Sequence, residues 1–232
     1  MDDREYAEAL RHVMTELTQQ FAHPTEIDDT LQSVTASSVE LIDGVDCADV
    51  LLVSGGDLFR SVAATSQLAV DMDDLQQRFR EGPCLDAAVG HPTVRCNDLR
   101  EDLRWPRFAQ AAVALGVHSL LSFQLFTHNA RMGALNLFGL KPCAFTTERE
   151  AVGAMLATHA AIALIADDVR LQFQSALASR DIIGQAKGMI MERFNVDAVR
   201  AFELLTRVSQ NSNIRVAEVA EEIVSRGSEP KF

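Results

Sequence analysis

From residue 147 to residue 194 the sequence follows a helical pattern for about 48 residues without a proline. Apolar residues recur along it at helical spacing, and glycine occurs only at positions 153, 184 and 188. Because ordinary globular helices have roughly 8–20 residues, this length without caps predicts a coiled coil between two domains. Two helices separated near Asp167 and Asp168 are the alternative, and we favour the continuous helix. Small residues dominate its middle, so we expect close contact between helices, including those of a homodimer.

The residues before this helix show the patterns of short β-strands. We expect strands at 47–54, 58–65, 93–96, 119–126 and 131–140, with a Gly55-Gly56-Asp57 turn after the first. Two strand pairs look like hairpins, which predicts an antiparallel sheet. Helical patterns occur at 26–42, 73–79 and 105–116. The sequence therefore predicts an α+β domain over residues 25–166, preceded by an N-terminal helix within residues 1–24 that Pro24 terminates.

After this domain we expect a helical connector at 167–178 and a three-helix unit at 179–228. The first helix of the unit is the end of the long helix, with an apolar stripe of Ile183, Ala186, Ile190 and Phe194. Asn195 or Asp197 can cap the second helix, which should bury Ala201, Leu204, Leu205 and Val208. The third runs from about 215 to 226, stops at Gly227 and should bury Val216, Val219, Ala220 and Ile223.

Charge is unevenly distributed along the chain. A net charge of -12 and a pI near 4.9 argue against non-specific binding of nucleic acid or anionic membranes by the whole protein. Residues 175–232 hold eight of the 21 basic and eight of the 33 acidic residues, so the first 174 residues carry the entire acidic excess.

Cysteine usage and the absence of export signals indicate a cytoplasmic protein. The N-terminus has no apolar signal region, and no run of 18 uncharged apolar residues follows it. The cysteines contain no C-x-x-C pair and predict reduced thiols; they are Cys47, Cys84, Cys96 and Cys143. We therefore expect a soluble, cytoplasmic protein with no membrane partner.

Two glycines four residues apart, Gly184 and Gly188, lie in the long helix on either side of Lys187, one of three lysines in the chain. Each should weaken the helix by roughly 1 kcal/mol relative to alanine. With Arg180 and Met191 they fall along one side of the helix, beside the apolar stripe rather than within it. The missing side chains would let another backbone approach. That backbone could belong to an RNA or to a neighbouring helix, since this spacing also serves close packing.

The end of the chain carries motifs of a known family. The segments 185-QAKGMIMERF-194, 201-AFELLTRVSQNSN-213 and 217-AEVAEEIV-224 together resemble an ANTAR domain, the RNA-binding module of transcription antitermination regulators. One departure is Thr206, where many members have an arginine. The resemblance implies that a dimer binds paired RNA stem-loops in nascent leader transcripts and so prevents a competing terminator from forming.

The resemblance favours an RNA-facing role for Lys187, with Arg180, Gly184, Gly188 and Met191 beside it. Further candidates are basic residues whose alternative is a solvated surface position; they are Arg193, Arg207 and Arg215. Ser209 and Asn213 could reach base edges, or they could cap a helix end.

The acidic body resembles a GAF domain in 81-EGPCLDA-87, 104-RWPRF-108 and the strand pair at 119–126 and 131–140. GAF domains are small-molecule sensors or dimerisation modules, and the resemblance implies a ligand pocket on one face of an antiparallel sheet. Candidate pocket residues are Cys84, Trp105 and Phe108. Core packing is the alternative for Trp105 and Phe108, and Cys84 is either a redox-sensitive thiol or a small buried side chain.

The sequence contains no pattern that indicates catalysis. Four histidines are scattered without the spacing of a metal site, and a haem-ligand role for His118 has no support; the four are His91, His118, His128 and His159. No nucleophile–base set and no glycine-rich phosphate loop occurs. We therefore expect no enzyme activity, no metal and no cofactor.

Taken together, these patterns predict a homodimeric, signal-responsive, RNA-binding regulator of transcription antitermination. A DNA-binding transcription factor is one alternative, because three short helices can resemble a helix-turn-helix. The charge-balanced tail disfavours it, since DNA readers usually carry a basic excess. A ligand-gated interaction protein whose tail only dimerises is the other.

Overall fold

The computed structural model describes residues 7–8, 10–15, 26–54, 58–89, 91–126 and 132–227. It contains two compact units, which we call the N-terminal unit (Met1–Asp168) and the C-terminal unit (Val169–Phe232). The predicted fold class is confirmed, with an antiparallel sheet, a long helix and further helices at the C-terminal end.

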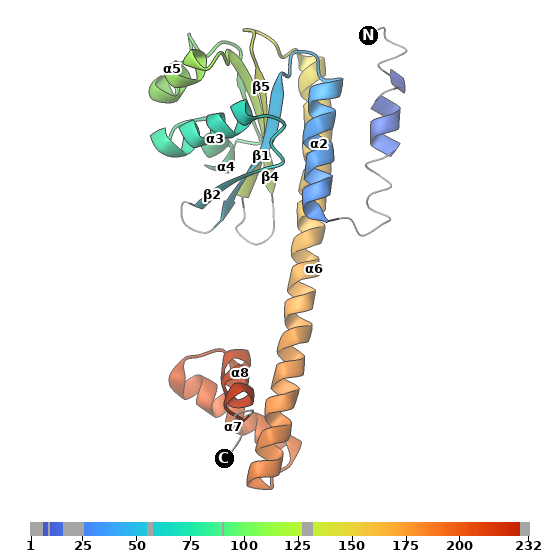
Figure 1. The fold of residues 1–232 in the computed structure, drawn as a ribbon, viewed down its shortest axis with the longest axis vertical. Coiled ribbons are helices and arrows are strands. Elements are labelled where there is room, and N and C mark those ends of the chain that lie inside the picture. Colours follow the sequence, from blue (N-terminus) through green and yellow to red (C-terminus); the bar gives the residue numbers. More distant parts are fainter. Residues whose placement is uncertain are drawn as a thin grey trace. The chain divides into compact units, whose positions relative to one another are not determined.

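A five-stranded antiparallel sheet forms the centre of the N-terminal unit (Figure 1). Its order is β2-β1-β5-β4-β3, with β1 (Cys47–Ser54), β2 (Leu58–Val62), β3 (Thr93–Cys96), β4 (Ser119–Phe126) and β5 (Met132–Gly139). The two predicted hairpins are the antiparallel pairs β1–β2 and β4–β5. β2 ends earlier than predicted because Ala63 adopts a left-handed conformation, with φ 54°. The predicted turn at 55–57 lies outside the described residues.

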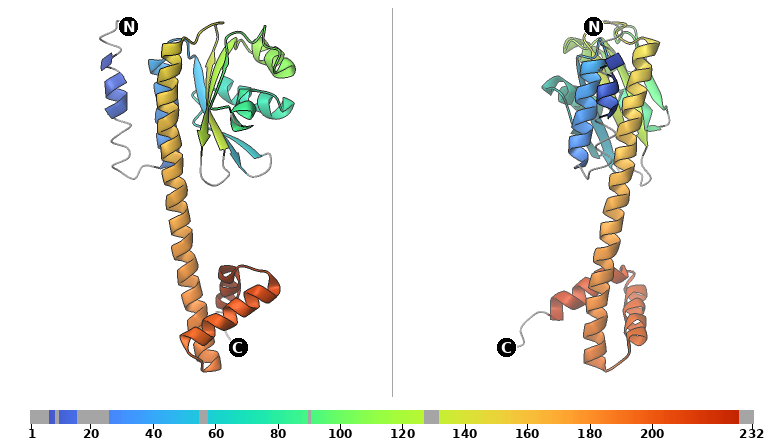
Figure 2. Two further views of the ribbon diagram at one scale, coloured as in Figure 1. Left: turned by 180° about the vertical axis from the view of Figure 1, so that it is seen from behind. Right: turned by 90° about the vertical axis from the view of Figure 1, so that its right-hand side faces the viewer.

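Helices cover both faces of this sheet (Figure 2). One face packs against α2 (Ile27–Leu41) and the first part of α6 (Thr147–Phe194), because alternate side chains of the strands, such as Val50 and Leu137, point to that side. The other face packs against α3 (Gln67–Phe79), α4 (Pro83–Val89) and α5 (Pro106–Ala114). The N-terminal unit is therefore a three-layer structure with two apolar cores.

Several helices differ from the sequence prediction. α3 begins six residues earlier than expected, at Gln67, and α4 was not predicted at all. Of the expected N-terminal helix, residues 10–15 are helical, and Val13 packs into the core on the α2 side. The remainder of that expected helix lies mostly outside the described residues.

α6 is one continuous helix of 48 residues, as predicted, with no break at Asp167 and Asp168. Length and composition alone would allow it to cross a membrane. Its first part, however, buries Leu156 and Ala160 in the core of the N-terminal unit, which accounts for much of its apolar character. Gly153 permits this packing, because an added Cβ would lie 2.6 Å from the Phe123 ring.

In the C-terminal unit, α7 (Ala198–Ser212) and α8 (Val216–Gly227) pack on the end of α6. Asp197 caps α7, since its carboxylate accepts a hydrogen bond of 2.7 Å from the Arg200 backbone N–H. The buried core consists of Ala186, Ile190, Ala201, Leu205, Val219 and Ala220. Two predictions are wrong: Phe194 and Val208 are largely exposed, because both lie towards the ends of their helices, beyond the residues that this core covers.

Candidate nucleic-acid interface and sensor site

The two glycines of the C-terminal unit lie at an open surface. A Cβ added to Gly184 or Gly188 would meet no atom of the described residues within 4 Å. This differs from Gly153 in the same helix, where the sheet requires the missing side chain. Packing against the described residues therefore does not explain Gly184 and Gly188, and within that part of the chain their side of α6 is open to an RNA or to a second copy.

Of the five basic residues predicted to face RNA, four form no salt bridge with a described residue, whereas the fifth, Arg215, is paired with Glu218. Arg200, Arg215 and Arg226 each form a salt bridge with a glutamate. Four other cations form none with the part of the chain that the structure describes; they are Arg180, Lys187, Arg193 and Arg207. Cations without acidic partners are the ones available for phosphate.

Lys187 has a neighbour that the sequence did not indicate. Its Nζ lies 5.8 Å from the centroid of the Phe202 ring, on α7. Both side chains are also partly exposed, since Lys187 is half-buried and Phe202 is 45% exposed. Because they are close together and both reach solvent, the cation and the aromatic ring lie on one surface. Attraction of the ammonium to the ring helps to hold the lysine in place.

The other predicted RNA contacts fall into two groups. Met191 is half-buried and packs partly against the core of the unit, and Arg193 lies about 120° around α6 from Lys187 at 100° per residue. Ser209 and Asn213 have structural roles at the end of α7. The Ser209 hydroxyl donates to the Ile214 carbonyl, and Asn213 is the left-handed C-cap, with φ 54°.

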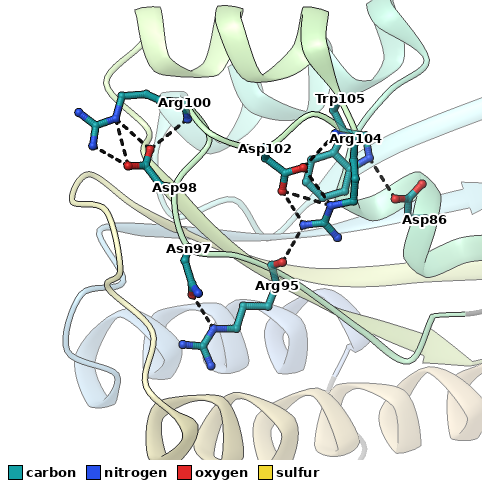
Figure 3. A network of polar contacts seen from close by, with 8 residues as sticks. All are labelled: Asp86, Arg95, Asn97, Asp98, Arg100, Asp102, Arg104 and Trp105. Carbon is teal, nitrogen blue, oxygen red and sulfur yellow. Dashed lines mark hydrogen bonds and ion pairs between the residues drawn. The ribbon is translucent and has the colours of Figure 1, made fainter.

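The predicted pocket residues of the N-terminal unit are buried. Trp105 packs edge-to-face with Phe108. Its indole N–H donates to Asp86 over 3.0 Å, and the Arg104 guanidinium lies 4.2 Å from the centroid of its ring (Figure 3). Asp102 holds Arg104 through its side chain. This geometry supports core packing for Trp105 and Phe108.

A row of buried polar side chains crosses the sheet on the face covered by α3. Asp49 in β1, Asn136 in β5 and Ser122 in β4 are direct cross-strand neighbours. Asn136 Nδ2 donates to Asp49 Oδ1 over 2.9 Å, and the Ser122 hydroxyl donates to Asn136 Oδ1 over 2.7 Å. From α3, Asp73 adds a second carboxyl group that accepts from Asn136 and Gln76. We call Asp49, Ser122, Asn136, Asp73 and Gln76 the polar row.

The polar row contains two carboxyl groups and no neutralising cation. Asp49 and Asp73 are almost fully buried, and neither forms a salt bridge with a described residue. Burial and the neighbouring Asp73 raise the pKa of Asp49 well above its usual range, and burial raises the pKa of Asp73 to about 7. The pair therefore retains a proton near neutrality. Asp49 Oδ2 and Asp73 Oδ2 accept no hydrogen bond from the described residues.

Cys84 lies beside this pair, fully buried in α4. Burial, with the nearby Asp73 and Asp49 charges, raises the pKa of its thiol well above the ordinary value. A thiol held in the protonated form is a poor nucleophile, so the environment disfavours a redox-sensitive role and supports the buried apolar alternative.

Comparison with known proteins decides the family. A GAF domain model matches residues 24–165, more than half of the chain. The chain belongs to the GAF family. An ANTAR domain model matches residues 171–224. The suspected order, a GAF domain followed by an ANTAR domain, is confirmed. GAF domains sense signals and ANTAR domains bind RNA, so both parts of the chain are regulatory modules.

Solved structures agree on the fold of the GAF domain. A free methionine-R-sulfoxide reductase from Neisseria meningitidis, with its substrate bound, matches at 18% identity and a TM-score of 0.54, over 70% of this chain and 91% of that one. The GAF domain of a phosphoenolpyruvate-protein phosphotransferase from Coxiella burnetii matches at 17% identity and a TM-score of 0.54, over 73% of this chain and 98% of that one.

A third structure is that of an N-acylhomoserine lactone dependent LuxR family transcription factor from Burkholderia cenocepacia. It matches at 14% identity and a TM-score of 0.54, over 72% of this chain and 99% of that one. At these identities the similarity concerns the fold alone. No curated protein matches the sequence.

Sequence reasoning missed the polar row of the GAF domain and Phe202 of the ANTAR domain. Asp49, Ser122 and Asn136 are polar residues within otherwise apolar strands, and this interruption was a visible signal. Their pairing across three strands required the register. The sequence did not indicate that Phe202 is exposed, because Phe202 follows Ala201 in an apolar pattern that is typical of buried residues.

Proposed function

We propose that this protein is a cytoplasmic, homodimeric regulator of transcription antitermination. Its ANTAR domain, at 179–228, binds RNA stem-loops in nascent transcripts, and its GAF domain, at 25–166, senses a small molecule. Residues 167–178 are the helical connector. The protein acts by binding, without a metal, a cofactor or a reaction of its own.

One observation carries this proposal: the open surface around Lys187. Gly184 and Gly188 weaken α6, and no described residue packs so closely that it requires them. Lys187 and Arg180 lie on the same side of the helix without acidic partners among the described residues. Bare helix backbone flanked by unpaired cations suits the approach of a phosphate backbone.

The homodimer is supported by a second stripe along α6. Its exposed apolar side chains recur at intervals of seven or four residues and so fall on one side of the helix; they are Met155, Ile162, Val169, Phe173 and Leu177. A monomer would leave this stripe in water. A second copy of α6 covers it if the helices pair as a coiled coil.

The sensing role is supported by the polar row. Two buried carboxyl oxygens lack a hydrogen-bond partner among the described residues, which is costly, and a polar ligand would satisfy them. Redox sensing at Cys84 has no comparable support, because its thiol is buried and protonated.

Binding of the full chain to an RNA hairpin and to duplex DNA of matching sequence tests the proposal. We expect tighter binding to the hairpin in a fluorescence anisotropy titration at fixed salt, since nucleic-acid affinity depends strongly on ionic strength. Preference for duplex DNA would favour the transcription-factor alternative. Binding to neither would favour an interaction protein whose tail only dimerises.

A further inference from the structure

Phe202 is an exposed aromatic residue on the surface that Lys187 shares. It lies on α7 next to Ala201, which is fully buried, yet 45% of Phe202 itself remains exposed. The core of the C-terminal unit is complete without the outer part of this ring, because Ala186, Ala201 and Leu205 are already covered. An aromatic ring left half in water is available to a ligand with a flat apolar face.

The charges around Phe202 select the kind of ligand. Lys187 Nζ lies 5.8 Å from the ring centroid, and Lys187 forms no salt bridge with a described residue. The nearest acidic residue in sequence, Glu203, is already paired with Arg200 over 2.7 Å. A flat ligand that also carries negative charge fits this surface, and a nucleotide has both properties.

We propose that Phe202 is a stacking platform for one unpaired base of the bound RNA, while Lys187 contacts the phosphate beside that base. The inference rests on the proposed function and adds a specificity-determining residue to it. Duplex bases are stacked on one another and inaccessible, whereas loop bases can be splayed out onto an aromatic side chain. The platform therefore favours hairpin loops over duplexes.

The test pairs a protein change with an RNA change. A hairpin that binds the wild-type full chain is first selected from a pool with a randomised loop, and each loop nucleotide is then made abasic in turn. We expect one abasic position to weaken wild-type binding about 10-fold, within the range for a stacked base. In Phe202→Leu, which keeps an apolar side chain, the same abasic position should have almost no further effect.

Three controls separate stacking from folding and charge. Phe202→Tyr should retain wild-type affinity, because the ring remains. Val208→Ala, at a residue of α7 that is 51% exposed and lies about 120° around the helix from Phe202, should change neither affinity nor melting temperature. Phe202→Leu should keep the salt dependence of the wild type, because it removes no phosphate contact.

Each outcome decides between distinct conclusions. Wild-type affinity of Phe202→Leu on the selected hairpin would overturn the platform and leave RNA binding intact. Weaker binding that is independent of every loop base, or a change in oligomeric state, would assign Phe202 to folding or to contact with a second copy. A wild-type chain that selects no hairpin would overturn both the platform and the proposed function.

Discussion

At the level of single residues, the three glycines of α6 are present for different reasons. Gly153 is required by the approach of the helix to Phe123, whereas Gly184 and Gly188 are not required by any described neighbour. A helix that carries two unneeded glycines gives up roughly 2 kcal/mol relative to alanine. We therefore expect the two glycines to serve contact with RNA or with a second copy of the chain.

Gly188→Ala should therefore stabilise the protein and impair binding. The added methyl meets open space, so helix propensity raises the free energy of unfolding by up to about 1 kcal/mol. The same methyl obstructs an approaching RNA backbone, so hairpin affinity should fall. Thermal denaturation and anisotropy titrations measure the two effects. A variant that melts earlier as a weaker dimer, with unchanged RNA affinity, would show that the glycine serves helix pairing between copies.

The buried carboxyl pair should make the GAF domain less stable as pH rises. Asp73 has a pKa of about 7 in the folded protein, against roughly 3.9 in an unfolded chain. Between these values the folded state binds more protons, so stability falls with pH by at most about 1.4 kcal/mol per unit for this group. The stability contributed by Asp73 should be lost as pH rises through about 7.

Asp73→Asn removes this titration while keeping the shape of the side chain. As pH rises from 5 to 7.5, the free energy of unfolding should therefore fall less in Asp73→Asn than in the wild type. Urea unfolding followed by the fluorescence of Trp105, the single tryptophan, measures it. Asp71→Asn, at a half-buried position of the same helix, is the matched control. Parallel pH profiles for Asp73→Asn and the wild type would contradict the shared-proton interpretation.

At the level of elements, α6 combines two faces with different requirements. Leu156 and Ala160 are buried within the GAF domain, while Phe173 is 65% exposed on the stripe that we assign to the dimer. Phe173→Glu should place a charge in that interface and convert the dimer to a monomer at micromolar concentration in analytical ultracentrifugation.

The same helix provides a control for this change. Leu171 is 39% exposed and lies about 200° around the helix from Phe173. Leu171→Glu should leave the dimer intact. A wild-type chain that sediments as a folded monomer, or equal dimerisation of both variants, would show that this stripe does not pair two copies.

The elements that the sequence predicted best are those with a strong period. The 48-residue α6 was predicted from end to end, and four of the five strands were placed to within one residue at each end. α4 was missed because its seven residues, which begin at the proline of a Gly-Pro pair, are too few to show a helical period. Phe194 and Val208 were assigned to the core by period alone, which does not show where a neighbouring helix ends.

At the level of the whole molecule, charge is divided according to domain. The ANTAR domain is nearly neutral while the GAF domain carries the acidic excess, so overall charge does not reveal an RNA-binding protein. The relevant charge is local, on four cations without described acidic partners. The sequence identified these four as candidates, but their freedom from salt bridges and the proximity of Lys187 to Phe202 depend on tertiary structure.

The central claim is that RNA binds at the Lys187 surface, and the salt dependence of hairpin affinity tests it most directly. Lys187→Ala should weaken binding and reduce the slope of log affinity against log salt by about one phosphate contact, roughly 0.7–0.9. Arg226→Ala removes the same charge from a residue paired with Glu222 and should leave the slope unchanged. Wild-type affinity and slope in Lys187→Ala would contradict the claim and make Lys187 an ordinary surface charge.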